Sequence, residues 1–431
     1  MTATTATSTT ILRKHVEYVS PVRQYTMAVA FGAFGALIWW LFARGVAANT
    51  TTKFVMTPSG SVTSFPDLNL PTRLTLYVLV ILPLALAVLQ AVMKGGFRSR
   101  TNLILFLVAG MFVFAFLTWG AAGKSMNMGG LLKTSLIKAV PLTLGALSGI
   151  ICERAGIINI AIEGMMLLGA FTGAFIGSVT GNLWVGMAAG VAAGVLMGAL
   201  HGVLSITYKS NQIVSGTVIN ILALGLTSYF SSKYLQVNEH LNNPGIFPPI
   251  NVPILEKIPF FGSLIFNNNL YIYAMIFFLF LLQFGLFYTR WGLRHRSVGE
   301  HPRAADTLGI NVNRTRWAAV LLGSAMAGFA GTYFTLGSVG RFDENMTAGR
   351  GFIALAAMIF GNWMPFGSFG AGLLFGFFDS LASKLAILGI RIPSQFLLML
   401  PYIITIVVLA GVVGRSTPPA AEGTPYEKEG H

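Results

Sequence analysis

Charged residues are scarce in this 431-residue chain, where Asp, Glu, Lys and Arg together make up only 10%. A soluble domain carries about 25% charged residues. Hydrophobic residues make up 54%, so the bilayer must be the solvent for most of the chain. Lipid offers no partner to free backbone polar groups, and the alternating ten-residue segments of an outer-membrane barrel are missing. The sequence therefore predicts an all-α polytopic membrane protein.

Metal ligands and a nucleotide-binding loop are also lacking. The single Cys152 excludes an internal disulfide, and the six histidines show no ligand spacing, so no metal site is expected. The segment from Gly120 to Ser125 ends like a phosphate-binding loop, but position 118 is Thr where that pattern requires Gly. ATP is therefore expected on a partner chain. A membrane-embedded enzyme needs clustered acids or histidines, and it is the weaker alternative.

The apolar residues gather in about twelve stretches. They are 25–42, 74–93, 103–123, 132–152, 157–179, 183–206, 213–235, 269–289, 317–339, 351–362, 366–388 and 395–413. The first 24 residues lack an apolar core with a cleavage site, so the first stretch is predicted to be a retained helix. The tenth is too short to cross a bilayer as a helix alone, and whether it spans or is re-entrant stays open.

Positive charge predicts the orientation. The loop at 290–316 contains six arginines, a density expected on the cytoplasmic side. Twelve crossings then place both termini in the cytoplasm, with the polar segments 43–73 and 236–268 outside. The net charge of +14 is spread over short loops rather than one basic face. We therefore expect lipid headgroups as partners and no nucleic acid.

Glycines are spaced for close helix packing. Gly186, Gly190, Gly194 and Gly198 share one helix face and let backbones approach each other in lipid. A Gly-Asn turn begins this helix at 181–184, and a similar turn at 361–363 precedes another glycine-rich helix. The two turns are predicted on opposite sides of the membrane, which favours an inverted repeat. Chance similarity between glycine-rich helices is the alternative.

Several polar residues fall within or beside the apolar stretches. Ionisable groups there need partners or water, since burial in lipid is costly. Glu163 shares a helix face with Asn159, four residues earlier. This pair either lines a pathway for a hydroxylated solute or ties two helices together. Asp379 has Lys384 five residues on, which is a poor helical spacing.

The arginine-rich loop contains helix signals of its own. Pro302 suits a first helical position, Arg303 to Leu308 can form about two turns, and Gly309 stops them. Ala304 and Ala305 give this short helix a slim face that fits a groove on another protein. The alternative is a positively charged loop with a capped turn and no partner.

Two motifs resemble a known family. The stretch 153–170, ERAGIINIAIEGMMLLGA, looks like the E-R-x-G-x-x-N-I-x-x-E-G-x-M-L-x-G-A signature of the membrane subunits of bacterial ABC importers for nucleosides and simple sugars. The stretch 299–311, GEHPRAADTLGIN, resembles the same family's G-E-N-P-x-A-A-x-x-x-G-I-N loop, with His301 in place of Asn. The likeness covers roughly 130–413, and the N-terminal part exceeds the family pattern.

The resemblance implies a particular assembly in the bacterial inner membrane. The chain would be half of a translocation pathway, paired with a second permease, with a cytoplasmic ATPase that binds ATP and Mg, and with an extracytoplasmic solute-binding protein. Asn159 and Glu163 would lie near the pathway. The coupling loop to the ATPase would comprise Gly299, Glu300, His301, Pro302, Arg303, Ala304, Ala305, Gly309 and Asn311.

The implied organisation has five parts. They are a cytoplasmic tail at 1–24, an N-terminal membrane extension at 25–123, a ten-helix permease core at 124–413 with its coupling loop at 290–316, and a cytoplasmic tail at 414–431. A nucleoside is the favoured solute and a ribose-type sugar stays open. The alternative function is a self-contained ion-coupled transporter, with Glu163 and Asp379 as candidates for the ion site.

Overall fold

The computed structural model describes residues 20–58, 60, 61, 63–387, 399 and 416–428. The chain forms two compact units. Unit 1 comprises Met1–Phe54 and Asp67–Met126, and unit 2 comprises Val55–Pro66 and Asn127–His431. Among the described residues, ten helices are long and apolar enough to cross a bilayer. The prediction of a multi-pass helical membrane protein is confirmed.

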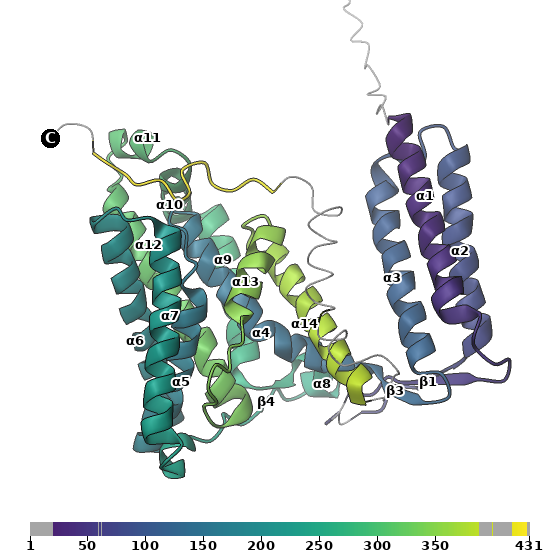
Figure 1. Ribbon diagram of the computed structural model, residues 1–431, viewed down its shortest axis with the longest axis horizontal. Helices are drawn as coiled ribbons and strands as arrows, with labels where there is room; N and C mark the ends of the chain where they lie inside the picture. The colour runs from purple at the N-terminus through teal and green to yellow at the C-terminus, as the bar shows by residue number, and fades with distance from the viewer. Residues whose placement is uncertain (1–19, 59, 62, 388–398, 400–415, 429–431) are drawn as a thin grey trace, which may run out of the picture. The chain divides into compact units, whose positions relative to one another are not determined.

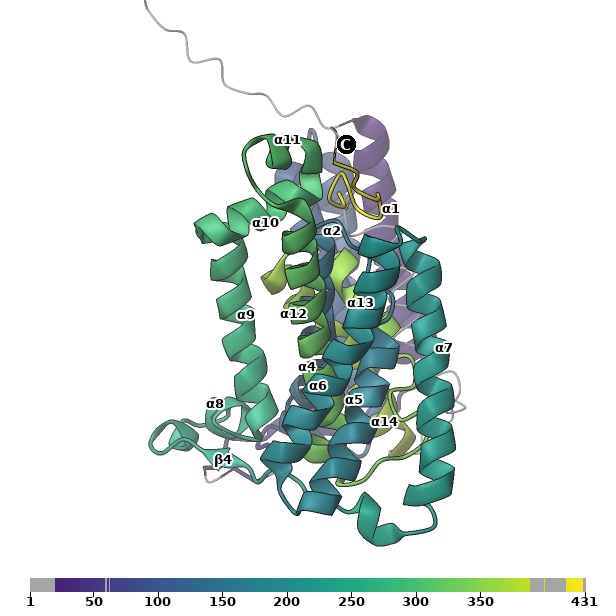
Figure 2. The same ribbon diagram turned by 90° about the vertical axis from the view of Figure 1, so that its left-hand side faces the viewer.

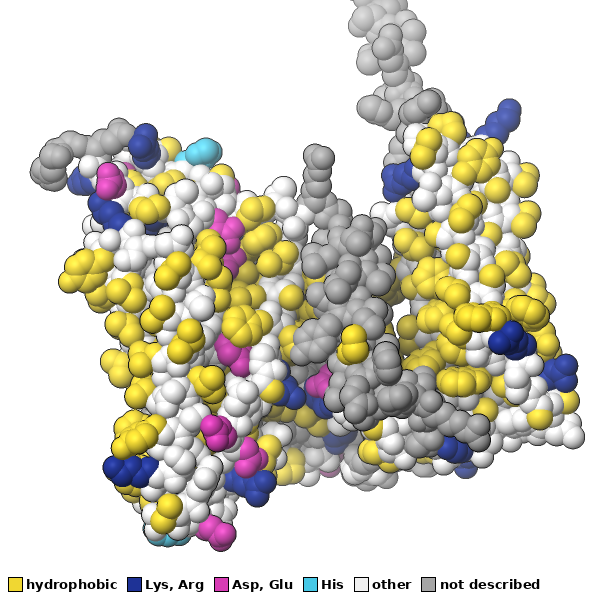
Figure 3. All heavy atoms as spheres, viewed as in Figure 1, with side chains coloured by type: hydrophobic (Ala, Val, Ile, Leu, Met, Phe, Trp, Pro, Cys, Tyr) yellow, Lys and Arg dark blue, Asp and Glu magenta, His cyan; other side chains and the backbone are white. Residues whose placement is uncertain are grey.

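Unit 1 is a bundle of three helices (Figure 1). They are α1 (Pro21–Ile38, extended by a π-turn to Ala43), α2 (Thr72–Val92) and α3 (Thr101–Gly120). Hydrophobic side chains cover the flanks of this bundle, and lysines and arginines lie near the helix ends (Figure 3). That distribution suits a bundle surrounded by lipid.

A small antiparallel sheet lies at one end of unit 1. The central strand β1 (Thr51–Val55) pairs with β2 (Leu68–Pro71) and β3 (Ser125–Asn127). Thr51 lies opposite Pro71 in the register, and Lys53 forms an ion pair of 2.9 Å with Asp67. The predicted polar segment 43–73 therefore contains two strands, which a search for long apolar stretches does not detect.

Unit 2 contains the remaining helices. They are α4 (Met128–Glu153), α5 (Ile162–Thr180), α6 (Leu183–Gly202), α7 (Gln212–Phe230), α8 (Phe261–Ile265), α9 (Leu270–Tyr288), α10 (Arg290–Glu300), α11 (Pro302–Thr307), α12 (Val312–Thr332), α13 (Arg350–Phe360) and α14 (Pro365–Ile387). Helices α6, α7 and α12 each continue through a π-helical turn, to Thr207, Leu235 and Val339. Strands β4 (Ile250–Asn251) and β5 (Asn267–Asn268) form a short hairpin pair.

Two predicted helix starts differ from the structure by five residues, and one helix was not predicted. Helix α5 begins at Ile162 rather than at 157, because residues 154–161 form a non-helical segment. Helix α12 begins at Val312 rather than at 317, so the last two arginines of the predicted loop belong to its first turns. The same loop contains the helix α10, capped by the Thr289 hydroxyl, which was not predicted. The twelfth stretch, 395–413, lies outside the described residues.

The glycine face of α6 packs against two helices. A Cβ atom at Gly186 would lie 2.6 Å from a carbonyl oxygen of α5, and one at Gly194 would lie 2.6 Å from a carbonyl oxygen of α12. Gly190 and Gly198 likewise leave no room for a side chain. Helices α5, α6 and α12 are therefore in backbone contact, which larger residues at these positions would prevent.

The two ends of unit 2 differ in charge. Helices α10 and α11 and the yellow 416–428 segment lie at one end, whereas β4 and α8 lie at the other (Figures 1 and 2). The loops and helix ends at the α11 end carry Arg154, Lys209, Arg290, Arg294, Arg296, Arg303, Arg314 and Arg316. The described loops and helix ends at the opposite end carry Lys133, Lys233, Lys257, Arg341 and Lys384. Positive charge is therefore concentrated at the α11 end of unit 2.

Candidate functional site

A buried non-helical segment, 154–161, joins α4 to α5, and every residue in it is buried or half-buried. Its backbone groups are bound by side chains of α6 and α7. The Ile158 N–H donates to Gln212 Oε1 at 2.7 Å, its carbonyl lies 2.9 Å from His201 Nε2, and Asn220 Nδ2 donates to another carbonyl of the segment at 2.9 Å. Irregular backbone at membrane depth requires such partners.

Glu163 lies in the first turn of α5 and accepts three hydrogen bonds from the residues around the start of α13. The Thr347 hydroxyl donates to Oε1 at 2.6 Å, the Gly349 N–H donates to Oε1 at 2.8 Å, and the Gly351 N–H donates to Oε2 at 2.6 Å. Only 8% of Glu163 is exposed. The carboxylate thus occupies the N-terminus of α13, where unpaired N–H groups and the helix dipole favour negative charge.

Helix α13 is a half-helix, since its 11 residues span only about half of the hydrocarbon core. Gly349 precedes it in a left-handed conformation with φ of +80°, which glycine adopts without strain. The next residue but one, Gly351, lies so close to Glu163 that a Cβ atom would come within 2.5 Å of the Glu163 backbone. The backbones of α5 and the start of α13 are therefore in direct contact, and the Glu163 carboxylate binds the N–H groups at this contact.

Asn159, four residues before Glu163, is fully buried. Its Nδ2 lies 3.5 Å from the sulfur of Cys152 and 3.8 Å from the sulfur of Met165, both weak acceptors. Its Oδ1 has no hydrogen-bond partner among the described residues. Although Asn159 and Glu163 were expected on one helix face, Asn159 precedes α5, so the two side chains are placed by different backbone conformations.

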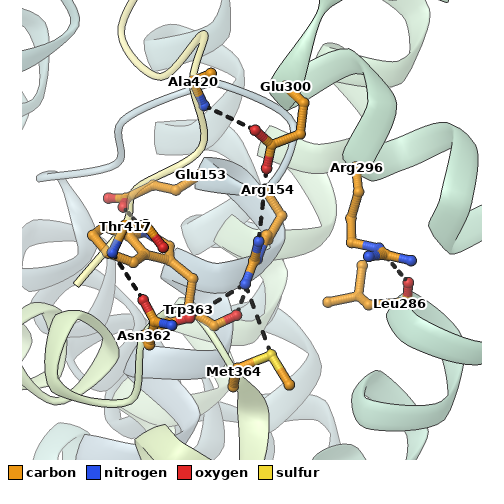
Figure 4. A network of polar contacts seen from close by, with 10 residues as sticks. All are labelled: Glu153, Arg154, Leu286, Arg296, Glu300, Asn362, Trp363, Met364, Thr417 and Ala420. Atoms are coloured by element: carbon orange, nitrogen blue, oxygen red, sulfur yellow. Dashed lines mark hydrogen bonds and ion pairs between the residues drawn. The ribbon is translucent and has the colours of Figure 1, made fainter. Parts of the chain in front are cut away.

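A polar network connects the α4 end to the turn after α13 (Figure 4). Trp363 Nε1 donates to Glu153 at 2.5 Å, while Arg154 donates from Nε to the Trp363 carbonyl at 3.1 Å. Arg154 also donates to the Asn362 carbonyl at 3.2 Å. Asn362 and Trp363 both have positive φ, near +54° and +53°, which is unfavourable for side-chain-bearing residues. The network holds this strained turn in place.

The same network reaches the loop at 299–311. Arg154 forms an ion pair of 3.9 Å with Glu300, the last residue of α10. Its guanidinium also lies over the Phe287 ring, as does that of Arg296. Burial lowers the pKa of Arg154, and the Glu300 carboxylate opposes that shift. The signature stretch and the loop at 299–311, more than 130 residues apart, are therefore neighbours.

The short helix α11 begins at Pro302 and ends before Gly309, whose φ is +79°, as the sequence predicts. Ala305 is only 2% exposed and packs in a small apolar cluster with Val298 and Val312. Ala304 is exposed instead. The side of α11 that faces outward therefore contains one of the two alanines.

An exposed apolar side chain directly follows α11. Leu308, directly after α11, is 80% exposed, although it lies in a strongly charged region. Four of the other predicted loop residues are exposed. They are His301, Arg303 and Gly309 around α11, and Asn311, whose side chain caps α12 by accepting from the Arg314 N–H at 2.9 Å.

Asp379 pairs with a residue that the sequence did not indicate. Its carboxylate lies 3.1 Å from the ammonium of Lys138 on α4, rather than beside Lys384. Lys138 also donates to the Ser383 hydroxyl at 2.8 Å. Both members of the pair are about 30% exposed. Tight packing of α4 on α14 creates this pair, which spacing along a single helix does not reveal.

The sequence reasoning missed four polar residues that hold the site. His201, Gln212 and Asn220 bind the buried 154–161 segment, and Trp363 binds Glu153. Polar side chains within or at the ends of apolar stretches were the available signal, since each needs a partner in the membrane. Among the described residues, no group of three or more His, Cys, Asp or Glu side chains is placed to hold a metal ion.

These features are typical of a membrane transport subunit. The non-helical segment 154–161 and the half-helix α13 interrupt its helical core, and α10 and α11 lie at one end of it. The chain belongs to the family described as the permease component of the branched-chain amino acid transport system, whose model matches residues 131–409. It is therefore the permease subunit of an ABC-type transport system and not an enzyme. Helices α1 to α3 precede the matched residues.

Curated relatives agree with this assignment. The chain is 39% identical over 303 residues to the guanosine ABC transporter permease NupQ of Bacillus subtilis, covering 68% of this chain and 95% of that protein. It is 40% identical over 307 residues to the nucleoside permease NupC of Lactococcus lactis, with the same coverage. A putative glucose permease of Haloferax volcanii, TsgC13, is 34% identical over 309 residues, covering 67% of this chain and 92% of that protein. No solved structure matches the chain.

Proposed function

We propose that this permease forms half of the translocation pathway of an ATP-driven nucleoside importer in a bacterial inner membrane. It pairs with a second permease, receives solute from an extracytoplasmic binding protein, and is driven by a cytoplasmic ATPase that binds ATP and Mg. The observation that carries the proposal is α11, a short helix with an exposed Leu308 at the arginine-rich end of unit 2. The relatives named for guanosine and nucleosides support the solute.

The geometry of α13 supports an uncharged solute. Half-helix N-termini in transporters commonly bind anionic groups of the substrate. Here the Glu163 carboxylate already accepts from the Gly349 and Gly351 N–H groups at that terminus. A phosphorylated nucleotide would meet this carboxylate, whereas a nucleoside or a simple sugar carries no charge that conflicts with it. In this proposal Asn159 and Glu163 border the pathway and act on it by positioning α13.

The coupling role is tested by changing the exposed side of the 299–311 loop. Ala304→Trp is expected to uncouple ATP hydrolysis from uptake in reconstituted vesicles, because α11 with this bulky side chain would no longer fit a groove on the ATPase. Leu308→Asp should weaken ATPase binding by about tenfold, since it removes an apolar anchor. Ile254→Asp is a matched control, because Ile254 is 79% exposed at the opposite end of unit 2. Unchanged binding and coupling in the first two variants would refute the assignment.

The solute is tested with the complete transporter. Uptake of labelled guanosine into vesicles that contain both permeases, the ATPase and the binding protein should be competed by other nucleosides and not by glucose. Competition by glucose alone would replace the nucleoside with a sugar, as the name of the Haloferax volcanii relative suggests for that protein.

A further inference from the structure

Residues 416–428 lie beyond the part of the chain that the family model matches, yet they cross the α11 end of unit 2 (Figures 1 and 2). The Ala421 N–H donates to the Gly299 carbonyl at 2.8 Å, and the Gly423 N–H donates to the Gly156 carbonyl at 3.1 Å. Residues 420–423 form a turn, and two N–H groups of this turn thus bind the two family motifs at once.

The two motif glycines are placed at close backbone contacts. A Cβ atom at Gly299 would clash with the Arg154 carbonyl. Gly156 has φ of +87°, and a Cβ atom there would lie 3.1 Å from the Ala421 carbonyl oxygen. Both positions therefore need glycine, because α10, the 154–161 segment and the 416–428 segment approach each other with no space for a side chain.

A buried cation also depends on the segment. Arg316, in the first turns of α12, is 2% exposed and donates from Nη1 to the Thr424 carbonyl at 2.9 Å. Its Nε and Nη2 atoms are buried without a hydrogen-bond partner among the described residues. Since a buried guanidinium needs acceptors, the segment supplies an acceptor that the helices of unit 2 do not.

Side chains fix the far end of the segment. Tyr426 is 9% exposed and packs in the same apolar cluster as Ala305 of α11. Glu427 forms an ion pair of 2.8 Å with Lys209 in the loop between α6 and α7. Nearer the start, the Ala420 N–H donates to Glu300 at 3.2 Å (Figure 4). The segment is therefore attached to the coupling loop along most of its length.

A groove of about 660 Å³ separates the segment from α11. Exposed residues line both walls, with His301, Arg303 and Ala304 on one side and Ala420 and Pro425 on the other. Buried Ala421 and Tyr426 form the base of the segment's attachment and also border the groove, whereas the side chains of Ala420 and Pro425 are exposed in it. A six-residue helix has little stability by itself, so the attached segment serves as its support.

We propose that this groove is part of the ATPase docking site, and that the 416–428 segment forms its second wall. The inference rests on the proposed function, which assigns α11 to the ATPase. The groove is continuous with α11 and opens beside its exposed alanine, so an element of the ATPase that contacts α11 also contacts the segment. The ATPase is thereby connected through Gly156 and Gly299 to the signature segment inside the membrane.

The test fills the groove by changing two exposed side chains that make no attachment themselves, since Ala420 is attached through its backbone N–H only. Ala420→Trp places a large side chain in the groove, and Pro425→Trp does so from a second position. Thr417→Trp is the matched control, because Thr417 is an exposed residue of the same segment that does not line the groove. ATPase binding is titrated against the full permease complex in nanodiscs, and thermal denaturation of each variant checks that it is folded.

Both groove-filling variants should weaken ATPase binding by about tenfold or more, with the control within about twofold of the unchanged protein. If they bind like the control while Leu308→Asp binds weakly, the segment is not part of the docking site and the proposed function stands. If neither they nor Leu308→Asp weaken binding, the assignment of α11 to the ATPase is itself wrong.

Discussion

Removing the Glu163 carboxylate should separate a supporting role from direct contact with solute. In Glu163→Ala, the Thr347 hydroxyl and the Gly349 and Gly351 N–H groups lose their acceptor. Glu163→Gln keeps one oxygen for two of these donors but turns an NH₂ group toward the Gly351 N–H. The two variants therefore remove different numbers of the same hydrogen bonds from the start of α13.

The magnitudes follow from the number of donors left unpaired. A hydrogen bond to a charged group contributes about 1.5–3 kcal/mol, and an unsatisfied buried donor costs about as much. Three such donors give a loss of about 5 kcal/mol for Glu163→Ala. One lost bond and one donor facing another give about 2 kcal/mol for Glu163→Gln. Glu344→Gln, at an exposed residue of the loop before α13, should change stability by less than about 0.5 kcal/mol.

The assay measures stability and transport separately. Thermal denaturation of the purified complex should rank the variants as Glu344→Gln, Glu163→Gln and Glu163→Ala, from most to least stable. Uptake per folded complex should fall less steeply than the amount of folded complex. The reasoning is refuted if Glu163→Gln is as stable as the unchanged protein but no longer transports, since the carboxylate would then act on the solute directly.

Three further predictions concern packing, charge and pH. Gly194→Ala should cost about 2 kcal/mol because α12 leaves no room for its Cβ atom, whereas Gly225→Ala, with open space around it, should be neutral in the same denaturation assay. Lys138→Met should sharply reduce the yield of folded protein by leaving the Asp379 carboxylate unpaired within the membrane span, and adding Asp379→Leu should restore that yield; no recovery in the double variant would contradict this. Burial lowers the pKa of His295 to about 4. Because the unfolded side chain titrates near pH 6.5, only the unfolded state binds this proton between pH 6.5 and 4, and stability should fall by up to about 3 kcal/mol as the pH drops through that window. A His295→Asn variant should lose this part of the pH dependence.

The sequence by itself determined that lipid surrounds most of the chain, that the fold is helical, and which family the chain belongs to. Long apolar stretches require helices in lipid regardless of how the helices pack, so ten of the twelve predicted stretches correspond to helices long enough to span. The glycine spacing on α6 and the start of α11 at Pro302 were equally readable, since both depend on local backbone geometry.

Only the tertiary structure decided which polar groups meet. Glu163 was recognised as significant, but its partners lie 184 to 188 residues away in the approach to α13. Asp379 was given a neighbour on its own helix, and α4 supplies the actual partner, Lys138. Two further features have no hydrophobic periodicity from which they could be predicted. They are the non-helical segment 154–161 before α5 and the segment 416–428, which binds both motifs. Their stability comes from long-range backbone hydrogen bonds, which depend on where the helices place their ends rather than on the residues nearby in sequence.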